Sequence, residues 1–319
     1  MADQRAGAES KVYGLFDRPV PSGGYAWWYV DAISEDGAYA LTLIAFIGSV
    51  FSPYYAWSGR HDPLNHCALN VALYGRRGQR WTMTERGRNS VHIAANEFGI
   101  GPSCVRWDGD GLTVDIRETG MPIPFPVRGR VRLVPRMLNT RQFAIDAGDC
   151  HHWRPIAPFA DVEVDFDSPR LSWRGQGYFD TNFGDGPLED AFRYWDWSRM
   201  HEKNGTTTLS YTTDSRNGEQ VGHALRFSRD GNLEAVRRQP AIELPSSPIF
   251  GIRRRAHPIA PYPIKLDSTL EDTPFYSRST ISSRIEGQQA RGVHESLDGN
   301  RLRQTLVKMM LPFRMPRRA

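Results

Sequence analysis

The chain has 319 residues, of which 39% are hydrophobic and 24% charged, with a formal net charge of +4 and a mean hydropathy of −0.52. These values are typical of a globular protein with one large or two medium-sized domains, and they argue against a disordered or membrane-embedded chain. The three cysteines, Cys67, Cys104 and Cys150, are widely spaced and odd in number, which argues against a disulfide framework and a thiolate metal site.

The N-terminal segment MADQRAGAES lacks the basic flank and the apolar run of a signal peptide. The cysteine pattern fits a reducing compartment. We therefore expect a cytoplasmic protein.

The stretch AYALTLIAFIGSVFSPYYAW, residues 38–57, has twenty residues and no formal charge. Twenty residues is about the length of a bilayer crossing. However, the stretch contains Gly48 and Pro53, its strongest apolar run covers only residues 41–51, and no second span follows. We therefore favour a buried strand followed by an aromatic loop at the mouth of a barrel.

Alternating strand patterns and frequent turn signals follow along the chain, as in residues 111–116, 161–166 and 206–213. Short strands at this density are typical of barrels and sandwiches. One run of strands begins near Trp27 and another near Trp195, with a linker-like segment between them. We therefore predict an all-β fold of two tandem β-barrel domains with a short C-terminal helix, the domains covering residues 1–190 and 191–319.

Two segments hold residue types that bind metals, HDPLNH (61–66) and CHHW (150–153). Neither has the spacing of a known zinc motif, so ordinary surface or core histidines are the preferred interpretation. The chain also lacks a P-loop, a dinucleotide fingerprint followed by a helix, and a G-x-S-x-G elbow. We predict no metal and no cofactor.

Two pairs of residues carry the clearest chemical signal. His151 and Trp153 are two residues apart, as are Tyr178 and Asp180, and residues i and i+2 of a strand share a face. The sequence between the pairs is typical of a hairpin that turns at residues 167–169. If both pairs point into one barrel, an imidazole, an indole, a phenol and an acid converge. The spacing alone favours the plainer alternative of two unrelated inward-facing pairs.

These residues lie in segments that resemble a known family. HHW and GYFDTNFG, with YWDWSR after them and GGYAWWYVDAISEDGAYALTLIAFIGSVFSPYYAW before them, strongly resemble the carotenoid 1,2-hydratases, also called hydroxyneurosporene synthases. The resemblance implies a tandem lipocalin-like fold. It also implies a cofactor-free lyase that adds water to the terminal C1=C2 bond of acyclic carotenoids such as neurosporene and lycopene. The family's His-x-Trp and Tyr-x-Asp active-site pairs fall on His151, Trp153, Tyr178 and Asp180.

Hydration of an alkene requires a proton at C2, tolerance of a cation at C1, and a controlled water. Asp180 is the expected acid, and raising its pKa by burial from about 3.9 to about 7 needs roughly 4 kcal/mol of differential stabilisation. The rings of Trp153 and Tyr178 are expected to stabilise the cation. His151 is expected to orient the water or to accept its proton.

A polyene has no hydrogen-bonding groups, so apolar area must hold it. One face of the strand in residues 41–47, with Leu43 at its centre, is expected to line a channel for the substrate. Plain core packing is the alternative. The expected contacts at the mouth of the channel are Phe51, Tyr54, Tyr55 and Trp57.

The C-terminal segment, residues 301–319, carries six basic residues and no acid, so it is +6 and the first 300 residues carry −2. A nucleic-acid protein usually spreads basic residues over a face of its fold, so no nucleic-acid partner is predicted. Apolar residues recur at near-helical spacing in this segment. We expect a helix that lies on an anionic bilayer and associates the protein peripherally with the inner membrane. A tail packed on its own barrel is the alternative.

Two other functions stay open. One is a lipocalin-like carrier of a hydrophobic ligand, in which Asp180 is a buried structural carboxyl, and the other is a pericyclase-type enzyme on the same scaffold. The two residue pairs favour the hydratase, because a carrier has no need for an acid beside aromatic rings.

Overall fold

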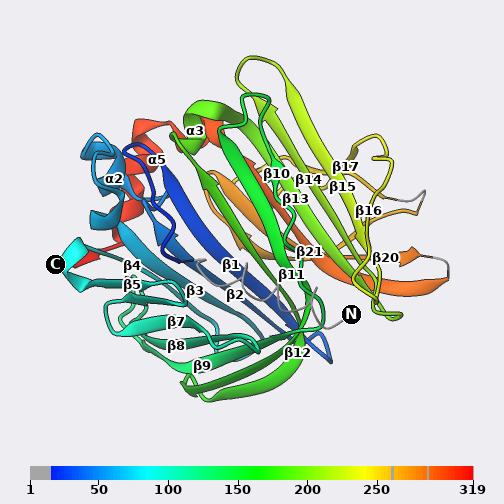
Figure 1. Cartoon of the computed structure of the whole chain (residues 1–319), viewed down its shortest axis with the longest axis horizontal. Coiled ribbons are helices and arrows are strands. Elements are labelled where there is room, and N and C mark those ends of the chain that lie inside the picture. Colours follow the sequence, from blue (N-terminus) through cyan, green and yellow to red (C-terminus); the bar gives the residue numbers. More distant parts are fainter. Residues whose placement is uncertain (1–15, 260–261, 286, 319) are drawn as a thin grey trace. The chain divides into compact units, whose positions relative to one another are not determined.

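A computed structural model describes residues 16–259, 262–285 and 287–318 (Figure 1). The N-terminal segment considered above for a leader lies outside these residues. The chain divides into two compact units. The first comprises the described residues of 1–143, 153–187 and 309–319, and the second those of 144–152 and 188–308.

Both units are built from strands that pair almost entirely antiparallel, which confirms the predicted all-β fold. The predicted domains, 1–190 and 191–319, stay a prediction. The main break between the units falls after residue 187. Residues 144–152 belong to the second unit although the residues on both sides of them belong to the first, and residues 309–319 belong to the first unit although they follow the second.

The first unit contains a thirteen-stranded sheet that curls until β4 lies near β8 and β3 near β6 (Figure 1). In hydrogen-bonded order its strands are β22 (Arg317–Arg318), β4 (Arg80–Arg86), β3 (Cys67–Gly75), β2 (Tyr39–Ile47), β1 (Tyr25–Ser34), β12 (Leu171–Gly184), β11 (His151–Ser168), β9 (Pro126–Pro135), β8 (Leu112–Thr119), β7 (Ser103–Trp107), β6 (Glu97–Ile100) and β5 (Val91–Ala94), with β10 (Phe143–Ala144) beside β11.

One face of this sheet packs the main apolar core, which gathers side chains from strands far apart in the sequence, among them Trp28, Leu69, Val114 and Phe179. The alternation in β8 shows why these residues form strands. Every second side chain of LTVDIRET is buried, because successive residues of a strand point to opposite faces.

The uncharged stretch at 38–57 forms β2 and then a short helix, α2 (Pro53–Trp57). The prediction of a buried strand is confirmed, but the prediction of an aromatic loop after it is wrong, because residues 53–57 form a helix. Ser52 is the reason, because its side chain accepts a hydrogen bond from the backbone N–H of Tyr55 at 2.9 Å and caps the helix. Pro53 at the first helical position favours the same start. Among the described residues no helix has the length and apolar character needed to cross a bilayer.

Strands β11 and β12 form the predicted hairpin, with Pro169 and Arg170 in the turn. On its other side β12 pairs with β1 over ten residues, which places Tyr29 opposite Asp180. Strand β1 also pairs with β2. These four strands provide the framework for the site described below.

The second unit contains a seven-stranded sheet and a two-stranded sheet (Figure 1). The larger sheet has the order β16 (Leu233–Ala235), β15 (Gln220–Phe227), β14 (Thr207–Ser215), β13 (Phe192–Glu202), β21 (Gln288–Asp298), β20 (Tyr276–Ile285) and β19 (Lys265–Asp272), and the smaller one pairs β17 (Ile242–Leu244) with β18 (Arg254–Ala256). The helices are α3 (Leu188–Ala191) and α4 (Gly299–Leu302), and α5 (Thr305–Met310) begins in this unit.

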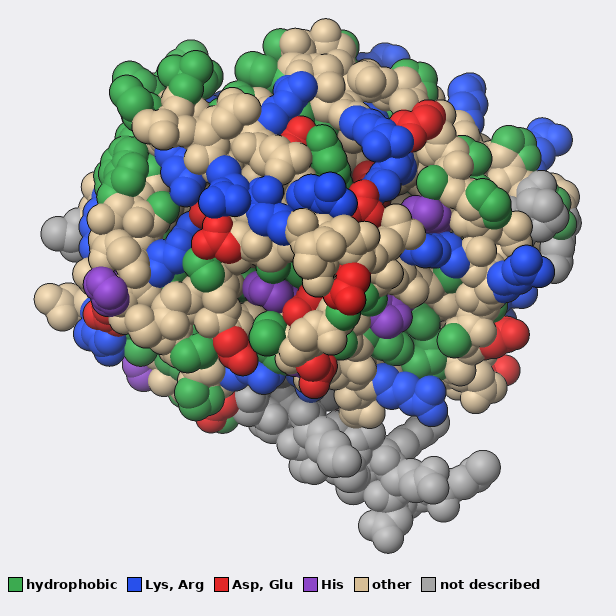
Figure 2. Space-filling view, turned by 90° about the horizontal axis from the view of Figure 1, so that it is seen from above, with side chains coloured by type: hydrophobic (Ala, Val, Ile, Leu, Met, Phe, Trp, Pro, Cys, Tyr) green, Lys and Arg blue, Asp and Glu red, His purple; other side chains and the backbone are tan. Residues whose placement is uncertain are grey.

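The predicted C-terminal helix is present as α4 and α5, followed by a short 3-10 helix and by β22, which pairs with the edge strand β4. Four of the six basic residues of this segment are within ion-pair distance of an acid, as Arg301–Asp298, Arg303–Asp190, Lys308–Glu189 and Arg317–Glu85. Basic side chains outside this segment also lie beside acids, for example Arg86 beside Glu118 and Arg278 beside Glu295. Figure 2 shows a face on which Lys and Arg side chains gather with Asp and Glu beside them.

Candidate active site

The structure brings together three of the four predicted catalytic residues around the carboxyl of Asp180. Its Oδ2 accepts a hydrogen bond from the Tyr178 hydroxyl at 2.8 Å and another from Trp153 Nε1 at 2.9 Å. Trp153 Nε1 is also 3.1 Å from the Tyr178 hydroxyl oxygen. Asn182 Nδ2 lies 3.4 Å from the other carboxyl oxygen, Oδ1. The carboxyl is buried, with Asp180 only 3% exposed.

Local sequence and strand pairing explain this cluster. Tyr178, Asp180 and Asn182 are at alternate positions of β12 and so share one face. Trp153 comes from β11, the neighbouring strand of the hairpin. The short-range pattern and one hairpin therefore suffice to place an indole and a phenol on the same carboxyl oxygen.

The electrostatics of the cluster keep Tyr178 protonated. Burial, followed by the neighbouring carboxyl of Asp180, raises the pKa of Tyr178 well above its ordinary value. The phenol therefore remains a hydrogen-bond donor. Because Oδ2 of Asp180 accepts both short hydrogen bonds, an acidic proton on this carboxyl belongs on Oδ1.

His151, the fourth predicted residue, lies at the start of β11 and groups with the second unit. It is buried, its backbone N–H donates to Asp146 Oδ1 at 2.7 Å, and its ring centre is 5.0 Å from that of Phe192. Its role at the site stays a prediction.

Two residues that the sequence analysis missed lie on the same face as Asp180. Strand pairing places Tyr29 opposite Asp180 and Asp31 opposite Tyr178. The Tyr29 hydroxyl donates to Asp31 Oδ2 at 3.0 Å, and the rings of Tyr29 and Tyr178 meet edge to face at 6.2 Å. The alternation in YAWWYVD, residues 25–31, is the signal that points to them.

A row of aromatic rings continues along this face of β1 and β2. Tyr25 and Trp27 are stacked with ring centres 5.0 Å apart, and Trp27 lies 6.1 Å from Phe46. Phe46 in turn lies 5.7 Å from Phe51. Phe51, a predicted substrate contact, is thus connected to the Asp180 face through neighbouring rings.

Leu43 lies on the opposite face of the sheet. It pairs with Val30, which pairs with Phe179, and all three belong to the apolar core. The cavity beside Leu43 has a volume of about 10 Å³, which is too small to hold more than a single water. The structure therefore does not bring Leu43 together with Asp180, and the alternative of plain core packing describes its surroundings.

The three remaining predicted contacts lie on α2 and differ in exposure. Tyr55 is fully buried, and its hydroxyl donates to the Gly24 carbonyl at 2.8 Å. Burial raises the pKa of Tyr55 to about 12. Tyr54 and Trp57 have ring centres 5.8 Å apart, and Trp57 is exposed. Tyr55 thus ties the helix to the sheet, while Trp57 is accessible.

Histidines of the two segments considered as metal ligands lie beside carboxylates. His66 Nδ1 lies 2.8 Å from Glu85 Oε1, and His152 Nε2 lies 2.9 Å from Asp149 Oδ1. Within the described part of the chain, no three His, Cys, Asp or Glu side chains are grouped to hold a metal ion.

Comparison with known proteins identifies the family. The model of the carotenoid hydratase family CrtC matches residues 43–319. An acyclic carotenoid 1,2-hydratase of Thiocapsa roseopersicina is 51% identical over 95% of this chain and 75% of its own length, and one of Rhodobacter capsulatus is 40% identical over 87% and 98%. A crystal structure of CghA with Sch210972, at 12% identity and a TM-score of 0.57 over 87% of this chain and 89% of that one, shares the lipocalin-like fold. The chain therefore belongs to the carotenoid hydratases, a family of enzymes.

Proposed function

We propose that this enzyme adds water to the terminal C1=C2 bond of an acyclic carotenoid such as lycopene or neurosporene, without a metal or an organic cofactor. The observation that carries the proposal is the buried Asp180 carboxyl, with one oxygen held by two donors and with aromatic rings on the same face. The family membership supports the reaction class.

In the proposed reaction, the Asp180 carboxyl transfers its proton from Oδ1 to C2 of the substrate. A tertiary cation forms at C1 and is captured by water. The captured water loses one proton, for which we assign His151 as the acceptor, because the ordinary pKa of histidine suits this role near neutral pH. The proton released by the captured water replaces the one that Asp180 gave up, so one water is added overall and the enzyme returns to its starting state.

The two short hydrogen bonds support this role for Asp180. Negative charge develops on the carboxyl as the proton leaves, and donors already aimed at Oδ2 stabilise that charge without reorganisation. Because Tyr178 keeps its own proton, it serves as such a donor throughout the reaction. Trp153 does the same through its indole N–H.

The aromatic row supports the binding of the polyene and of the cation. An aromatic face stabilises a desolvated cation by about 2 kcal/mol. Within this row, Tyr29 is paired directly opposite Asp180, and Trp27 and Phe46 extend the row along the sheet. We therefore place the terminal isoprene unit near Tyr29 and the conjugated chain along the rings.

Incubation with lycopene in liposomes, followed by mass analysis of the pigment, tests the proposal. The expected product is heavier by one water and forms equally well after treatment with EDTA. Loss of activity on chelation that a metal restores would refute the cofactor-free reaction. Unchanged lycopene under all conditions would favour the carrier or pericyclase alternatives.

We also propose that the enzyme takes its substrate from a membrane surface, through exposed apolar side chains near the C-terminus. Leu306, Met309, Met310 and Phe313 are exposed on α5 and the turn that follows, and Phe313 is 74% exposed. Since most of the basic residues there have acidic neighbours, apolar contact rather than charge is the stronger basis for this proposal.

Substitution of Met309 and Phe313 by serine tests the membrane contact better than truncation, because truncation also removes the buried Met315 and the strand β22. The double variant is expected to co-sediment less with anionic vesicles while keeping its melting temperature. Equal co-sedimentation of the variant and the wild type would refute this contact.

A further inference from the structure

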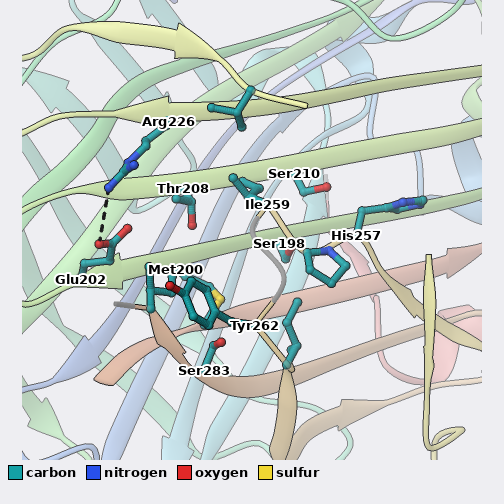
Figure 3. Close-up of a pocket in the computed structure, with 14 residues that line it drawn as sticks. Ser198, Met200, Glu202, Thr208, Ser210, Arg226, His257, Ile259, Tyr262 and Ser283 are labelled. Atoms are coloured by element: carbon teal, nitrogen blue, oxygen red, sulfur yellow. Dashed lines mark ion pairs between the residues drawn. The ribbon is translucent and has the colours of Figure 1, made fainter. Parts of the chain in front are cut away.

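The second unit contains a cavity of about 120 Å³ that the proposed reaction does not use (Figure 3). Strands β13, β14, β15 and β20 contribute to its lining, as does the segment that follows β18. Apolar side chains of Met200, Ile264 and Ile285 line it together with the hydroxyls of Thr208 and Ser210. An interior that combines apolar walls with a few polar groups is typical of small-molecule sites.

Glu202 is the buried polar group that points to a ligand. It lines the cavity and is only 4% exposed. Its Oε2 accepts a hydrogen bond from Asn204 at 3.2 Å and is 3.9 Å from an Arg226 nitrogen. Its Oε1 is buried and has no hydrogen-bond partner within the described part of the chain. In Figure 3 a dashed line joins Arg226 to one oxygen of Glu202, and the other oxygen lies on the side of Thr208.

His257 also borders the cavity, and Figure 3 shows its ring directed away from the other labelled side chains. His257 is 6% exposed, and its Nδ1 lies 3.2 Å from the Gln239 carbonyl. A carbonyl only accepts, so Nδ1 carries the proton of the neutral ring and Nε2 is an acceptor. Among the described residues Nε2 has no hydrogen-bond partner. Burial lowers the pKa of His257, with a further contribution from Arg238 and Arg255, so the ring is neutral.

Buried acceptors without partners are rare in folded proteins, and they are satisfied when a ligand brings donors. A hydroxyl group fits better than an ammonium group here. Arg226 already provides positive charge near Glu202, and Arg238 and Arg255 provide it near His257. The apolar walls require a hydrocarbon body. An engineered cavity of about 150 Å³ holds benzene, which has six heavy atoms, so this smaller one suits a group of about five heavy atoms.

We propose that this cavity is a second binding site, and that it takes a short branched aliphatic alcohol whose hydroxyl donates to Glu202 Oε1. The alcohol is either a free small molecule or the end of a longer one. The proposed reaction creates a tertiary alcohol at the end of a branched chain, so the reaction product is one source of such an end. That assignment of the source, unlike the site itself, rests on the proposed function.

Three small probes with five heavy atoms each test the site: 2-methylpropan-2-ol, its isomer isopropyl methyl ether, and 2-methylpropan-2-amine. The methyl resonance of Met200, which lines the cavity, reports binding. The alcohol is expected to shift this resonance with an affinity at least tenfold higher than that of the ether, which has no donor. Equal affinities for alcohol and ether, or tighter binding of the amine, would overturn the proposal.

Glu202→Gln is the matching variant. Its amide oxygen is expected to face Asn204 and Arg226, which leaves an N–H group towards the cavity in place of an acceptor. The affinity for the alcohol should fall at least tenfold, and the ratio of ether affinity to alcohol affinity should rise. Glu219→Gln, at an exposed carboxyl of the same unit, is the control and should change nothing. Unchanged alcohol binding in Glu202→Gln would refute the site.

Competition identifies the source of the alcohol. If the hydrated carotenoid displaces the probe, the site takes the product's end, and if it does not, the site takes a free small alcohol. Hydratase activity measured on the same samples keeps the two proposals apart. Probe binding without hydration would refute the proposed function alone, and hydration without probe binding would refute this site alone.

Discussion

Replacing Asp180 by asparagine removes the proposed acid and keeps the size of the side chain. The amide oxygen can take the place of Oδ2 and continue to accept from Trp153 at 2.9 Å and Tyr178 at 2.8 Å. The amide nitrogen then faces Asn182, whose own amide can turn to present its oxygen. The hydrogen-bonded cluster is therefore expected to survive.

The magnitudes separate a structural effect from a chemical one. The amide replaces a carboxyl that is itself neutral when it holds its proton, so the structural cost is limited to remaking its hydrogen bonds, at about 1 kcal/mol each. We expect the melting temperature to fall by no more than about 8 °C. Loss of a general acid, in contrast, lowers turnover by about 10²- to 10⁴-fold.

The assay is pigment conversion in liposomes beside a thermal melt for each variant. Asp31→Asn is the matched control, because Asp31 is an equally buried carboxyl on the same face and accepts a hydrogen bond from Tyr29 at 3.0 Å. It should lose less than about tenfold in turnover, well short of the effect of losing a general acid. An Asp180→Asn protein that melts normally and hydrates lycopene at near wild-type rate would refute the reasoning. A larger loss of turnover in Asp31→Asn than in Asp180→Asn would assign the role of general acid to Asp31.

Tyr178→Phe should keep the ring face and lose one donor to the carboxyl, so turnover should fall by about tenfold to a hundredfold, and an unchanged rate would contradict that role. His151→Ala should cost less turnover than Asp180→Asn, because water can find another proton acceptor. Burial lowers the pKa of His294 to about 3, below its unfolded value of about 6.5. The free energy of unfolding should therefore fall by about 1.4 kcal/mol per unit as pH drops from 6.5 towards 3, and denaturant titrations of His294→Gln should show a flatter slope. Maleimide should label the exposed Cys150 first and the buried Cys67 last, since burial also raises the pKa of the Cys67 thiol.

The part of the site that lies within one hairpin has its signals in the sequence, although spacing alone favoured two unrelated pairs and only the family resemblance joined them. Period-two spacing places Tyr178 and Asp180 on one face, and the turn signal at residues 167–169 predicts the pairing of the strands that carry Trp153 and Asp180. Each of these features depends on residues close together in the chain. The hydrogen bonds around Asp180 follow from them once the hairpin forms.

The part that depends on long-range pairing could not be predicted. Strand β1 pairs with β12 about 150 residues later, and only this register places Tyr29 and Asp31 beside the carboxyl. Strand β2 is buried on both faces, so apolarity alone does not distinguish the face of Leu43 from the face of Phe46. The prediction assigned the more aliphatic face of this strand, that of Leu43, to the substrate, and in the structure this face packs in the apolar core.

The C-terminal segment shows a second limit of sequence analysis. Counting charges in residues 301–319 treats each basic residue as available to a membrane. In the structure, acids from distant parts of the chain lie beside them, such as Glu85 beside Arg317 and Glu189 beside Lys308. A local composition therefore overstates the positive charge that a partner can meet, because the neutralising groups are supplied by the fold.

The position of Asp180 on the face away from the apolar core has a physical reason. The core beside Leu43 is packed so closely that the cavity there measures about 10 Å³, which is too small for a substrate. A carboxyl placed there would also lack hydrogen-bond donors and would be costly to bury. On the other face, Tyr178, Trp153 and Asn182 supply donors to the carboxyl. One sheet thus separates the residues that stabilise the fold from those proposed to carry the chemistry, so that substitutions in one set need not disturb the other.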